Sequence, residues 1–348
     1  MTDKPILAGT TLPELTEYLR NSGVPAYRAK QIRKWICEKF VVDPAAMSDL
    51  PEALREKLGC DFFAPSLAVD ERVEAADVEK LRLKLHDGEF IEMALIPSGE
   101  RLTFCLSTQV GCPVRCRFCA SGAFGLKRNL ESGEMIEEFL TGIAAAGRRP
   151  DNLVFMGIGE GLMNFRELSR TLAALTGDFQ FAPRRITVST SGFVPGMREF
   201  AELRREYTLA VSLHAPDDAT RSTLIPDACR YPIAEILAAA DLCRERNGRD
   251  YTLEYTLISG VNDAPEQAEA LGRIAYRHRA KVNLIPYNET TGEFRRPPER
   301  VLREFEAKVA ATGARVTRRV ERGGSSAAAC GQLRIKALQK KNDPTGGN

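Results

Sequence analysis

The sequence has no long apolar run. Its 348 residues contain no stretch of about 18 apolar side chains, the length that a membrane-spanning helix needs. The N-terminal segment has no apolar core followed by small residues, so it is not typical of a secretory signal peptide. These absences argue against the membrane and secreted classes of protein, and we expect a cytoplasmic protein.

The sequence also lacks an excess of charge of one sign and any short internal repeat. Lys and Arg total 49, Asp and Glu total 47, and the net charge is +2. A dedicated nucleic-acid-binding domain is usually much more basic, so any contact with RNA or DNA must come from local basic patches. Hydrophobic residues at 43% and charged residues at 28% exclude disordered, collagen-like and coiled-coil chains.

Cysteine, by contrast, is plentiful, with nine residues. In a reducing compartment these thiols are not expected to form a disulfide framework, and metal ligation or catalysis is favoured. Some of them have no motif around them and are expected to pack as small apolar side chains. These are Cys37, Cys60, Cys229 and Cys243.

Two small units are predicted before the main domain. Residues 1–60 have helical patterns and form a helical accessory domain. Its predicted helices are 12–21, 26–40 and 51–59. Residues 61–97 alternate in polarity, and Asp87-Gly88 is a strong hairpin signal between two strand-like runs, which predicts a β-hairpin element.

Strand-like and helix-like segments then alternate six times in the predicted core, residues 98–335. The strands are 102–107, 153–158, 185–190, 208–213, 251–258 and 282–287. The helices are 132–146, 165–175, 196–205, 233–246, 265–278 and 298–311. This rhythm predicts an α/β fold with a parallel sheet, either a partial (β/α)6 barrel or an open doubly wound sheet. Residues 336–348 are expected to form a disordered tail.

In both architectures ligands bind where the parallel strands end. Polar and sulfur-bearing residues follow the predicted strands at these places, which predicts a polar, sulfur-rich rim. They are Cys112, Cys116, Cys119, Gly159, Glu160, Ser191, His214 and Asn288.

Three of these cysteines have the spacing C-x3-C-x2-C, directly after the first strand of the core. A structural zinc site normally has four protein ligands, and no fourth Cys or His lies nearby. Three ligands leave one position open, as a catalytic metal centre requires. A zinc knuckle and three unrelated buried cysteines are the alternatives.

This cysteine loop resembles that of the radical S-adenosylmethionine (SAM) enzymes. The resemblance implies that Cys112, Cys116 and Cys119 hold a [4Fe–4S] cluster whose free iron chelates SAM. The segment Gly157-Ile-Gly159-Glu160 resembles the Gly-Glu motif that binds the SAM ammonium group in this superfamily.

Later strand ends resemble the RlmN/Cfr-type RNA methyltransferases, which act on adenine. These segments are Ser189-Thr-Ser191, Ser212-Leu213-His214 and the Asn288 that ends Asn283-Leu-Ile-Pro-Tyr-Asn288. The resemblance implies SAM contacts at Gly159, Glu160, Ser191, Ser212, Leu213, His214 and Asn288.

Two further cysteines resemble the reactive pair of the same family. Cys330 lies in Ala329-Cys330-Gly-Gln-Leu333, and Cys105 lies on the first core strand, thirteen residues after Glu92. The resemblance implies that one SAM methylates Cys330 and a second SAM yields a 5′-deoxyadenosyl radical. The methylcysteine radical then adds to adenine, Cys105 resolves the adduct by forming a disulfide with Cys330, and Glu92 assists proton removal.

The implied function is methylation of adenosine C2 in 23S rRNA, tRNA or both, with two SAM molecules per turnover. Methylation of adenine C8, a radical SAM enzyme with a non-RNA substrate and a non-catalytic zinc-bearing RNA-binding protein are the alternatives. We expect a monomer that receives electrons from a donor such as flavodoxin or ferredoxin.

Basic residues at both ends of the chain are the candidates for RNA contact. They are Arg28, Lys30, Arg33, Lys34, Arg184, Arg185, Arg315, Arg318, Arg319 and Arg322. The sequence departs from the family at 323–329, GGSSAAA, which carries no carboxylate, and at Gly161 after the Gly-Glu pair, where proline is usual. Both departures indicate a divergent member.

Overall fold

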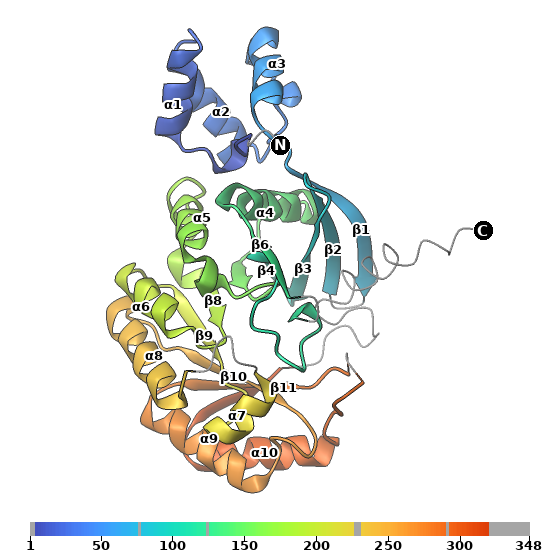
Figure 1. The fold of residues 1–348 in the computed structure, drawn as a ribbon, viewed down its shortest axis with the longest axis vertical. Helices are drawn as coiled ribbons and strands as arrows, with labels where there is room; N and C mark the ends of the chain where they lie inside the picture. The colour runs from blue at the N-terminus through green and yellow to red at the C-terminus, as the bar shows by residue number, and fades with distance from the viewer. Residues whose placement is uncertain (1–3, 76–77, 123–124, 226–230, 290–291, 320–348) are drawn as a thin grey trace, which may run out of the picture.

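The computed structural model describes residues 4–75, 78–122, 125–225, 231–289 and 292–319 (Figure 1). Cys229, Cys330, Arg322, the GGSSAAA segment and the predicted tail lie outside these ranges. Within them, no helix is both long and apolar enough to cross a membrane.

The predicted N-terminal helices are present as α1 Leu12–Asn21, α2 Arg28–Cys37 and α3 Glu52–Asp61. Short 3-10 turns, η1 Leu7–Gly9 and η2 Pro44–Ala46, flank them. The helix α1 begins at a capping box, in which the Thr11 side chain and the Glu14 carboxylate each accept a backbone N–H. The prediction for α2 ran on to residue 40, but Phe40 has a positive φ of 58°, which a helix does not allow.

We expected the basic residues of α2 on the surface, and for one of them this is wrong. Arg33 is buried, with its guanidinium bonded to the carbonyls of Ala8 and Thr10 and to Asp178. Its charge therefore joins α2 to the rest of the molecule and is not available to RNA. Lys30 and Lys34 of the same helix are exposed, as predicted.

The β element contains three strands, β1 Leu67–Ala75, β2 Val78–Leu85 and β3 Phe90–Ser98. The β2–β3 hairpin has its turn at the predicted Asp-Gly, where Gly88 has a φ of +82°. The strand β1, which the sequence analysis did not predict, pairs antiparallel with β2. The strand β3 pairs with the first core strand, β4 Arg101–Cys105, so the β element continues the sheet of the core.

The core has the predicted order of strands and helices. Its further strands are β7 Asn152–Phe155, β8 Ile186–Thr190, β9 Thr208–Ser212, β10 Thr252–Leu257, β11 Lys281–Pro286 and β12 Arg315–Arg318. The connecting helices are α4 Ser132–Ala146, α5 Phe165–Gly177, α6 Val194–Glu202, α8 Ile233–Asn247, α9 Pro265–Arg277 and α10 Glu299–Ala311. The further strands and β4 are parallel to one another, which confirms the six βα units. The strand β12 is a seventh parallel strand, which was not predicted.

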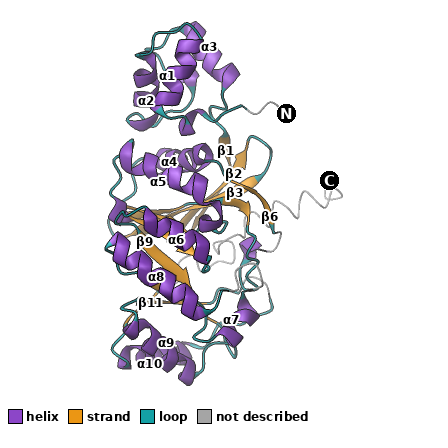
Figure 2. Cartoon of the chain, turned by 60° about the vertical axis from the view of Figure 1, so that its left-hand side comes forward, coloured by secondary structure: helices purple, strands orange, loops and turns teal. Residues whose placement is uncertain are grey.

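All these strands form one sheet in the order β1-β2-β3-β4-β7-β8-β9-β10-β11-β12. The helices line its outer side, as Figure 2 shows for α4, α5, α6 and α8. Apolar residues of the N-terminal helices and of the core belong to a single hydrophobic cluster. The α/β fold with a partial barrel, as predicted, is confirmed.

Short elements lie between the strands and helices. They are β5 Gln109–Gly111, η3 Ala120–Gly122, β6 Leu126–Asn129, η4 Gly161–Asn164, η5 Pro183–Arg185 and α7 Asp218–Leu224. All of them follow a strand of the main sheet except η5, which comes directly before β8. The strands β5 and β6 pair as a separate two-stranded ribbon. The predicted cysteine loop is the connection between them.

Candidate active site

A cavity of about 300 Å³ opens where the parallel strands end. Several residues predicted from the sequence line it, from widely separated parts of the chain. They are Cys105, Cys119, Ser212, His214 and Asn288. Its size is that of a small-molecule site, and its place agrees with the rule that α/β folds bind ligands at this edge.

The cysteine loop turns back on itself between β5 and β6. The Cys112 N–H donates to the Gly125 carbonyl at 3.1 Å, and the Cys119 N–H donates to the Cys116 carbonyl at 3.0 Å. Cys112, Cys116 and Phe118 pack on a small apolar cluster that includes Val114. The sequence therefore forms a compact loop that carries all three thiols on one side of the barrel mouth.

The donor set of this loop fits an iron–sulfur cluster chemically. Burial raises the pKa of the Cys112 thiol to about 12, so this thiol is protonated at neutral pH in the absence of a ligand. A bound cation would stabilise its thiolate form. Cys116 and Cys119 are partly exposed. Among the described residues, no three His, Cys, Asp or Glu side chains are arranged as a closed metal site. The three cysteines thus lie on one loop, but their sulfurs are not arranged as ligands of a common metal ion.

The Gly-Glu motif and the predicted serine contact each other directly. Glu160 is 3% exposed, and its Oε2 accepts from the Ser191 N–H at 2.6 Å and from the Ser191 hydroxyl at 2.7 Å. Burial raises the pKa of Glu160, and the hydrogen bonds from Ser191 act in the opposite direction. The Ser191 carbonyl in turn accepts from the buried Arg221. The ends of β7 and β8 are therefore joined by a carboxylate that is already hydrogen-bonded.

Glycine is required where β7 ends, because the chain passes very close to the segment after β4. A Cβ on Gly157 would lie 2.7 Å from the Leu106 carbonyl oxygen. A Cβ on Gly159, which has a φ of +116°, would lie 2.6 Å from the Thr108 hydroxyl oxygen. The two glycines thus let the end of β7 pack against the segment after β4, where the Glu160 N–H donates to Gln109 Oε1 at 2.8 Å.

His214 is held in one tautomer. Its Nδ1 accepts the Thr256 N–H at 3.0 Å, and burial lowers the pKa of its imidazole to about 3. The neutral ring therefore carries its proton on Nε2 and can donate from there. The Phe118 ring meets it edge to face, with centroids 4.7 Å apart. This contact links the cysteine loop to the end of β9.

The other predicted SAM contacts differ in position. Ser212 and Asn288 line the cavity. Leu213 is fully buried in the main hydrophobic cluster, and its N–H donates to the Glu254 carbonyl at 3.1 Å. Its side chain packs in the core, and Leu213 is not among the residues that line the cavity.

Cys105 and Glu92 meet at the β2–β4 side of the cavity. Both line a small adjoining cavity of about 20 Å³, together with Lys80. Cys105 also lines the large cavity. The predicted resolving cysteine and the predicted carboxylate are thus brought together, while Cys330 lies outside the described residues.

The cysteines assigned to packing follow that prediction in part. Cys243 is 2% exposed and Cys37 packs against the core. Cys60, at the end of α3, is exposed, so its assignment to packing was wrong. A short helix that presents only part of its surface to the core leaves this position in solvent.

Sequence reasoning missed Glu254, which lines the cavity, and its hydrogen-bond partner Asn283. Asn283 Nδ2 donates to Glu254 Oε2 at 2.7 Å, and burial raises the pKa of Glu254 to about 6. Both residues lie inside strands and not after them. The available signal was a charged residue in a strand of otherwise uncharged residues, Thr252–Leu257.

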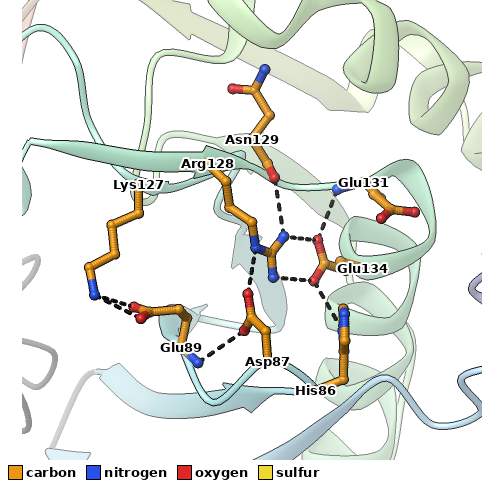
Figure 3. A network of polar contacts seen from close by, with 8 residues as sticks. All are labelled: His86, Asp87, Glu89, Lys127, Arg128, Asn129, Glu131 and Glu134. Atoms are coloured by element: carbon orange, nitrogen blue, oxygen red, sulfur yellow. Dashed lines mark hydrogen bonds and ion pairs between the residues drawn. The ribbon is translucent and has the colours of Figure 1, made fainter. Parts of the chain in front are cut away.

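A polar network holds the return strand of the cysteine loop in place (Figure 3). Arg128 of β6 donates to both oxygens of the fully buried Glu134, at 2.7 and 2.8 Å, and to Asp87 of the β2–β3 turn at 2.6 Å. The same Glu134 accepts the Glu131 N–H at 2.9 Å. The network joins β6, the hairpin turn and the start of α4, as the sticks in Figure 3 show.

Known families match both parts of the chain. The radical SAM superfamily matches residues 106–271, and the "ribosomal RNA large subunit methyltransferase N-terminal domain" matches residues 6–62. The first match spans the cysteine loop and the predicted SAM contacts up to His214. The second spans the three N-terminal helices.

Similar proteins extend over nearly the whole chain. A "probable dual-specificity RNA methyltransferase RlmN" from Akkermansia muciniphila is 40% identical over 98% of each chain. A protein of the same name from Gloeobacter violaceus is 41% identical over 95% of this chain and 96% of its own. The crystal structure of a radical SAM methyltransferase from Sphaerobacter thermophilus matches with a TM-score of 0.90 and 41% identity, over 94% of this chain and 98% of that one.

These matches exclude the alternative that the chain is a non-catalytic zinc-bearing RNA-binding protein, because its fold, its cysteine loop and both of its domains agree with one family of enzymes. A [4Fe–4S] cluster and SAM are the cofactors of that superfamily. The chain therefore belongs to the RlmN family, and it is a radical SAM RNA methyltransferase.

Proposed function

We propose that this enzyme methylates C2 of an adenosine in 23S rRNA, tRNA or both, through a methylated Cys330. One observation carries the proposal: Cys105 and Glu92 line a small cavity that adjoins the large one, and the large one is lined by Cys105, Cys119, Ser212, His214 and Asn288. Reaction at an electrophilic ring carbon needs a methyl carrier, a proton acceptor and a resolving thiol. The candidate residues supply all three.

Each predicted site residue has a proposed role. Cys112, Cys116 and Cys119 hold the cluster. Gly159 and the Glu160–Ser191 pair bind SAM at the ends of β7 and β8. Ser212, the Leu213 backbone, His214 and Asn288 complete its pocket. When bound, the cluster supplies the electron that cleaves SAM to methionine and a 5′-deoxyadenosyl radical.

The residues of this chain handle the methyl group. The Cys330 sulfur receives a methyl group from one SAM, and after hydrogen abstraction its methylene carbon bonds to adenine C2. The adduct is then a radical; it loses one electron, which the oxidised cluster would take back, and Glu92 accepts the proton from adenine C2. The Cys105 thiolate then bonds to the Cys330 sulfur, the sulfur–methylene bond breaks, and its electron pair leaves with the methylene. Protonation gives the methyl product, and cellular thiols reduce the Cys105–Cys330 disulfide.

We propose that the helical unit 1–60 contributes to RNA binding beside the β element, 61–97, and the core, 98–335. Exposed basic residues, among them Lys30, Lys34 and Arg184, are the contacts that remain after Arg33 is excluded. We propose a monomer that accepts electrons from a flavodoxin- or ferredoxin-type donor. Size-exclusion chromatography and reduction assays with each donor test these two points.

The experiment that tests the reaction is mass spectrometry of rRNA and tRNA treated with the anaerobically reconstituted enzyme. The protein is expected to hold about four irons and four sulfides, and to produce 2-methyladenosine. Cys330→Ala is expected to abolish methylation while SAM cleavage persists, and Cys105→Ala to accumulate a covalent protein–RNA adduct. A product methylated at C8, or full activity of Cys330→Ala, would contradict the proposal.

A further inference from the structure

Lys80 is a buried lysine beside the candidate catalytic carboxylate. Its side chain is 5% exposed, and its Nζ lies 3.8 Å from Oε2 of Glu92, whose side chain is 6% exposed. Lysine is rarely buried without a partner, and a buried carboxylate is equally costly. The two charges offset each other at the wall of the small cavity that Cys105 also lines.

The register of the sheet places Lys80 and Cys105 on one face. Lys80 of β2 pairs with Ala94 of β3, and Ala94 pairs with Cys105 of β4. Directly paired residues point to the same side of a sheet, and so does Glu92, two residues from Ala94. Because the side chain between them is only a methyl group, the long lysine side chain has room above β3.

Stability alone does not account for this ion pair. A buried pair contributes little net stability compared with apolar side chains of the same volume. Arg82, which the register places directly opposite Glu92, forms ion pairs with Asp70 and Glu71 of β1. Lys80 and Glu92, in contrast, line the small cavity at the candidate active site.

We propose that Lys80 is a positioning residue for the methyl-transfer reaction. Its ammonium group holds the Glu92 carboxylate toward the cavity, beside the Cys105 sulfur, where the proton of the RNA adduct must be accepted. This inference rests on the proposed function, because it gives Lys80 a role only through Glu92. Lys80 also lines the large cavity, so the formation of 5′-deoxyadenosine has to be measured beside RNA methylation.

The test compares variants of the reconstituted full chain acting on the RNA substrate. Lys80→Met keeps the length of the side chain without its charge, and Lys80→Arg keeps the charge. Lys84→Met is the matched control, because Lys84 is an exposed residue of the same strand. Three quantities are measured for each: the rate of RNA methylation, the formation of 5′-deoxyadenosine, and the thermal unfolding midpoint.

Lys80→Met is expected to lower kcat for RNA methylation by about 10- to 100-fold, as a displaced catalytic group does, with KM for RNA unchanged. Formation of 5′-deoxyadenosine is expected to persist, Lys80→Arg to recover most of the rate, and Lys84→Met to match the wild type. If Lys80 acts through Glu92, the double variant Lys80→Met/Glu92→Gln is expected to be no slower than Glu92→Gln alone.

Three results would overturn the inference: a wild-type methylation rate in Lys80→Met, no recovery in Lys80→Arg, or effects of Lys80→Met and Glu92→Gln that multiply. A parallel loss of 5′-deoxyadenosine and of thermal stability in Lys80→Met would also do so, since it would indicate a structural role. Failure of the proposed function would look different from failure of this inference. In that case the wild type would form no 2-methyladenosine, or Glu92→Gln would keep full activity.

Discussion

Gly159 is a residue at which the backbone leaves little room for a side chain. Its φ of +116° and the 2.6 Å approach that a Cβ would make to the Thr108 hydroxyl both oppose any side chain. Gly159→Ala must therefore shift the chain beside Glu160. We expect it to weaken SAM binding at least about 10-fold and to reduce the free energy of unfolding by about 1–3 kcal/mol. Isothermal titration with SAM and urea denaturation measure these effects.

Gly147→Ala is the control for this variant. Gly147 also has a positive φ, +66°, but a Cβ there would meet no atom within 4 Å. Alanine at this position has the energetic cost of the left-handed conformation but no steric clash. Gly147 lies at the end of α4, away from the cavity. Equal losses of SAM affinity in both variants would show that close packing at Gly159 does not shape the SAM site.

Glu254 makes the stability of the protein depend on pH. Its pKa of about 6, against 4.5 for an ordinary glutamate, arises mainly from burial and means that the folded state binds this proton more tightly. The group therefore stabilises the fold below about pH 4.5, and this contribution is lost as pH rises through about 6. A shift of this size corresponds to about 2 kcal/mol.

Glu254→Gln, which keeps an oxygen for Asn283, is expected to remove this dependence. Relative to the wild type, the variant should gain about 2 kcal/mol in free energy of unfolding between pH 4 and pH 7. Urea denaturation of both proteins at several pH values measures the difference. The other buried carboxylates with raised pKa values are shared by the two proteins, so their effects cancel. A difference that does not change with pH would contradict the prediction.

At the scale of elements, the network of Figure 3 controls how the ribbon β5–β6 is attached to the core. Arg128→Met would leave the Glu134 carboxylate, which is fully buried, with a backbone N–H and the His86 ring, 3.7 Å away, as neighbours. Removing one partner of such a pair is expected to lower the free energy of unfolding by about 3 kcal/mol. Since β6 is the return strand of the cysteine loop, iron content after reconstitution should also fall.

Lys127→Met is the matched control on the same strand. The Lys127 side chain is 40% exposed and pairs with Glu89, 20% exposed, at 2.7 Å. A pair at the surface contributes at most about 1 kcal/mol, so stability and iron content should remain close to those of the wild type. If Lys127→Met and Arg128→Met lost the same stability, burial of Glu134 would not be the cause.

Elements with strong periodicity were predictable, and those whose identity depends on a neighbour were not. The helix α4 begins and ends as predicted, because its pattern is long and ends at Gly147 in the left-handed conformation. The strands β1 and β12 are charged edge strands whose residues resemble a loop until the sheet supplies a hydrogen-bonding partner.

The candidate site divides in the same way. Residues that follow strands were predictable, because every parallel strand ends at one edge of the sheet. Lys80 was not, because its position against Glu92 depends on the register of β2 on β3, which periodicity does not give. Pairing across a sheet is set by contacts between segments, and a single sequence carries no direct signal for it.

At the scale of the whole molecule, the N-terminal helices meet the core at a contact between two glycines. A Cβ on Gly9 would lie 2.6 Å from the Gly133 Cα, and a Cβ on Gly133 would lie 2.6 Å from the Ile6 Cβ. The turn η1 therefore lies directly on the first turn of α4. Arg33, bonded to Asp178, and Arg170, 3.3 Å from Glu14, add polar links across the same boundary.

Gly133→Ala is expected to loosen this docking. Alanine favours a helix over glycine by about 1 kcal/mol, yet here its Cβ collides with Ile6, so we expect a net loss of about 1–3 kcal/mol. If the N-terminal helices bind RNA as proposed, KM for RNA should rise while RNA-independent formation of 5′-deoxyadenosine stays unchanged. Urea denaturation and steady-state kinetics measure the two effects.

The opposite sign is expected for Gly59→Ala, which tests the same substitution inside α3 where a Cβ would meet nothing within 4 Å. There the helix preference acts alone, and the free energy of unfolding should increase by up to about 1 kcal/mol with unchanged kinetics. Two glycine-to-alanine changes with opposite signs would locate the cost at the boundary between the N-terminal helices and the core. If both variants were more stable than the wild type, η1 and α4 would not be in close contact. If Gly133→Ala left KM for RNA unchanged, the contact of the N-terminal helices with the core would not matter for RNA binding.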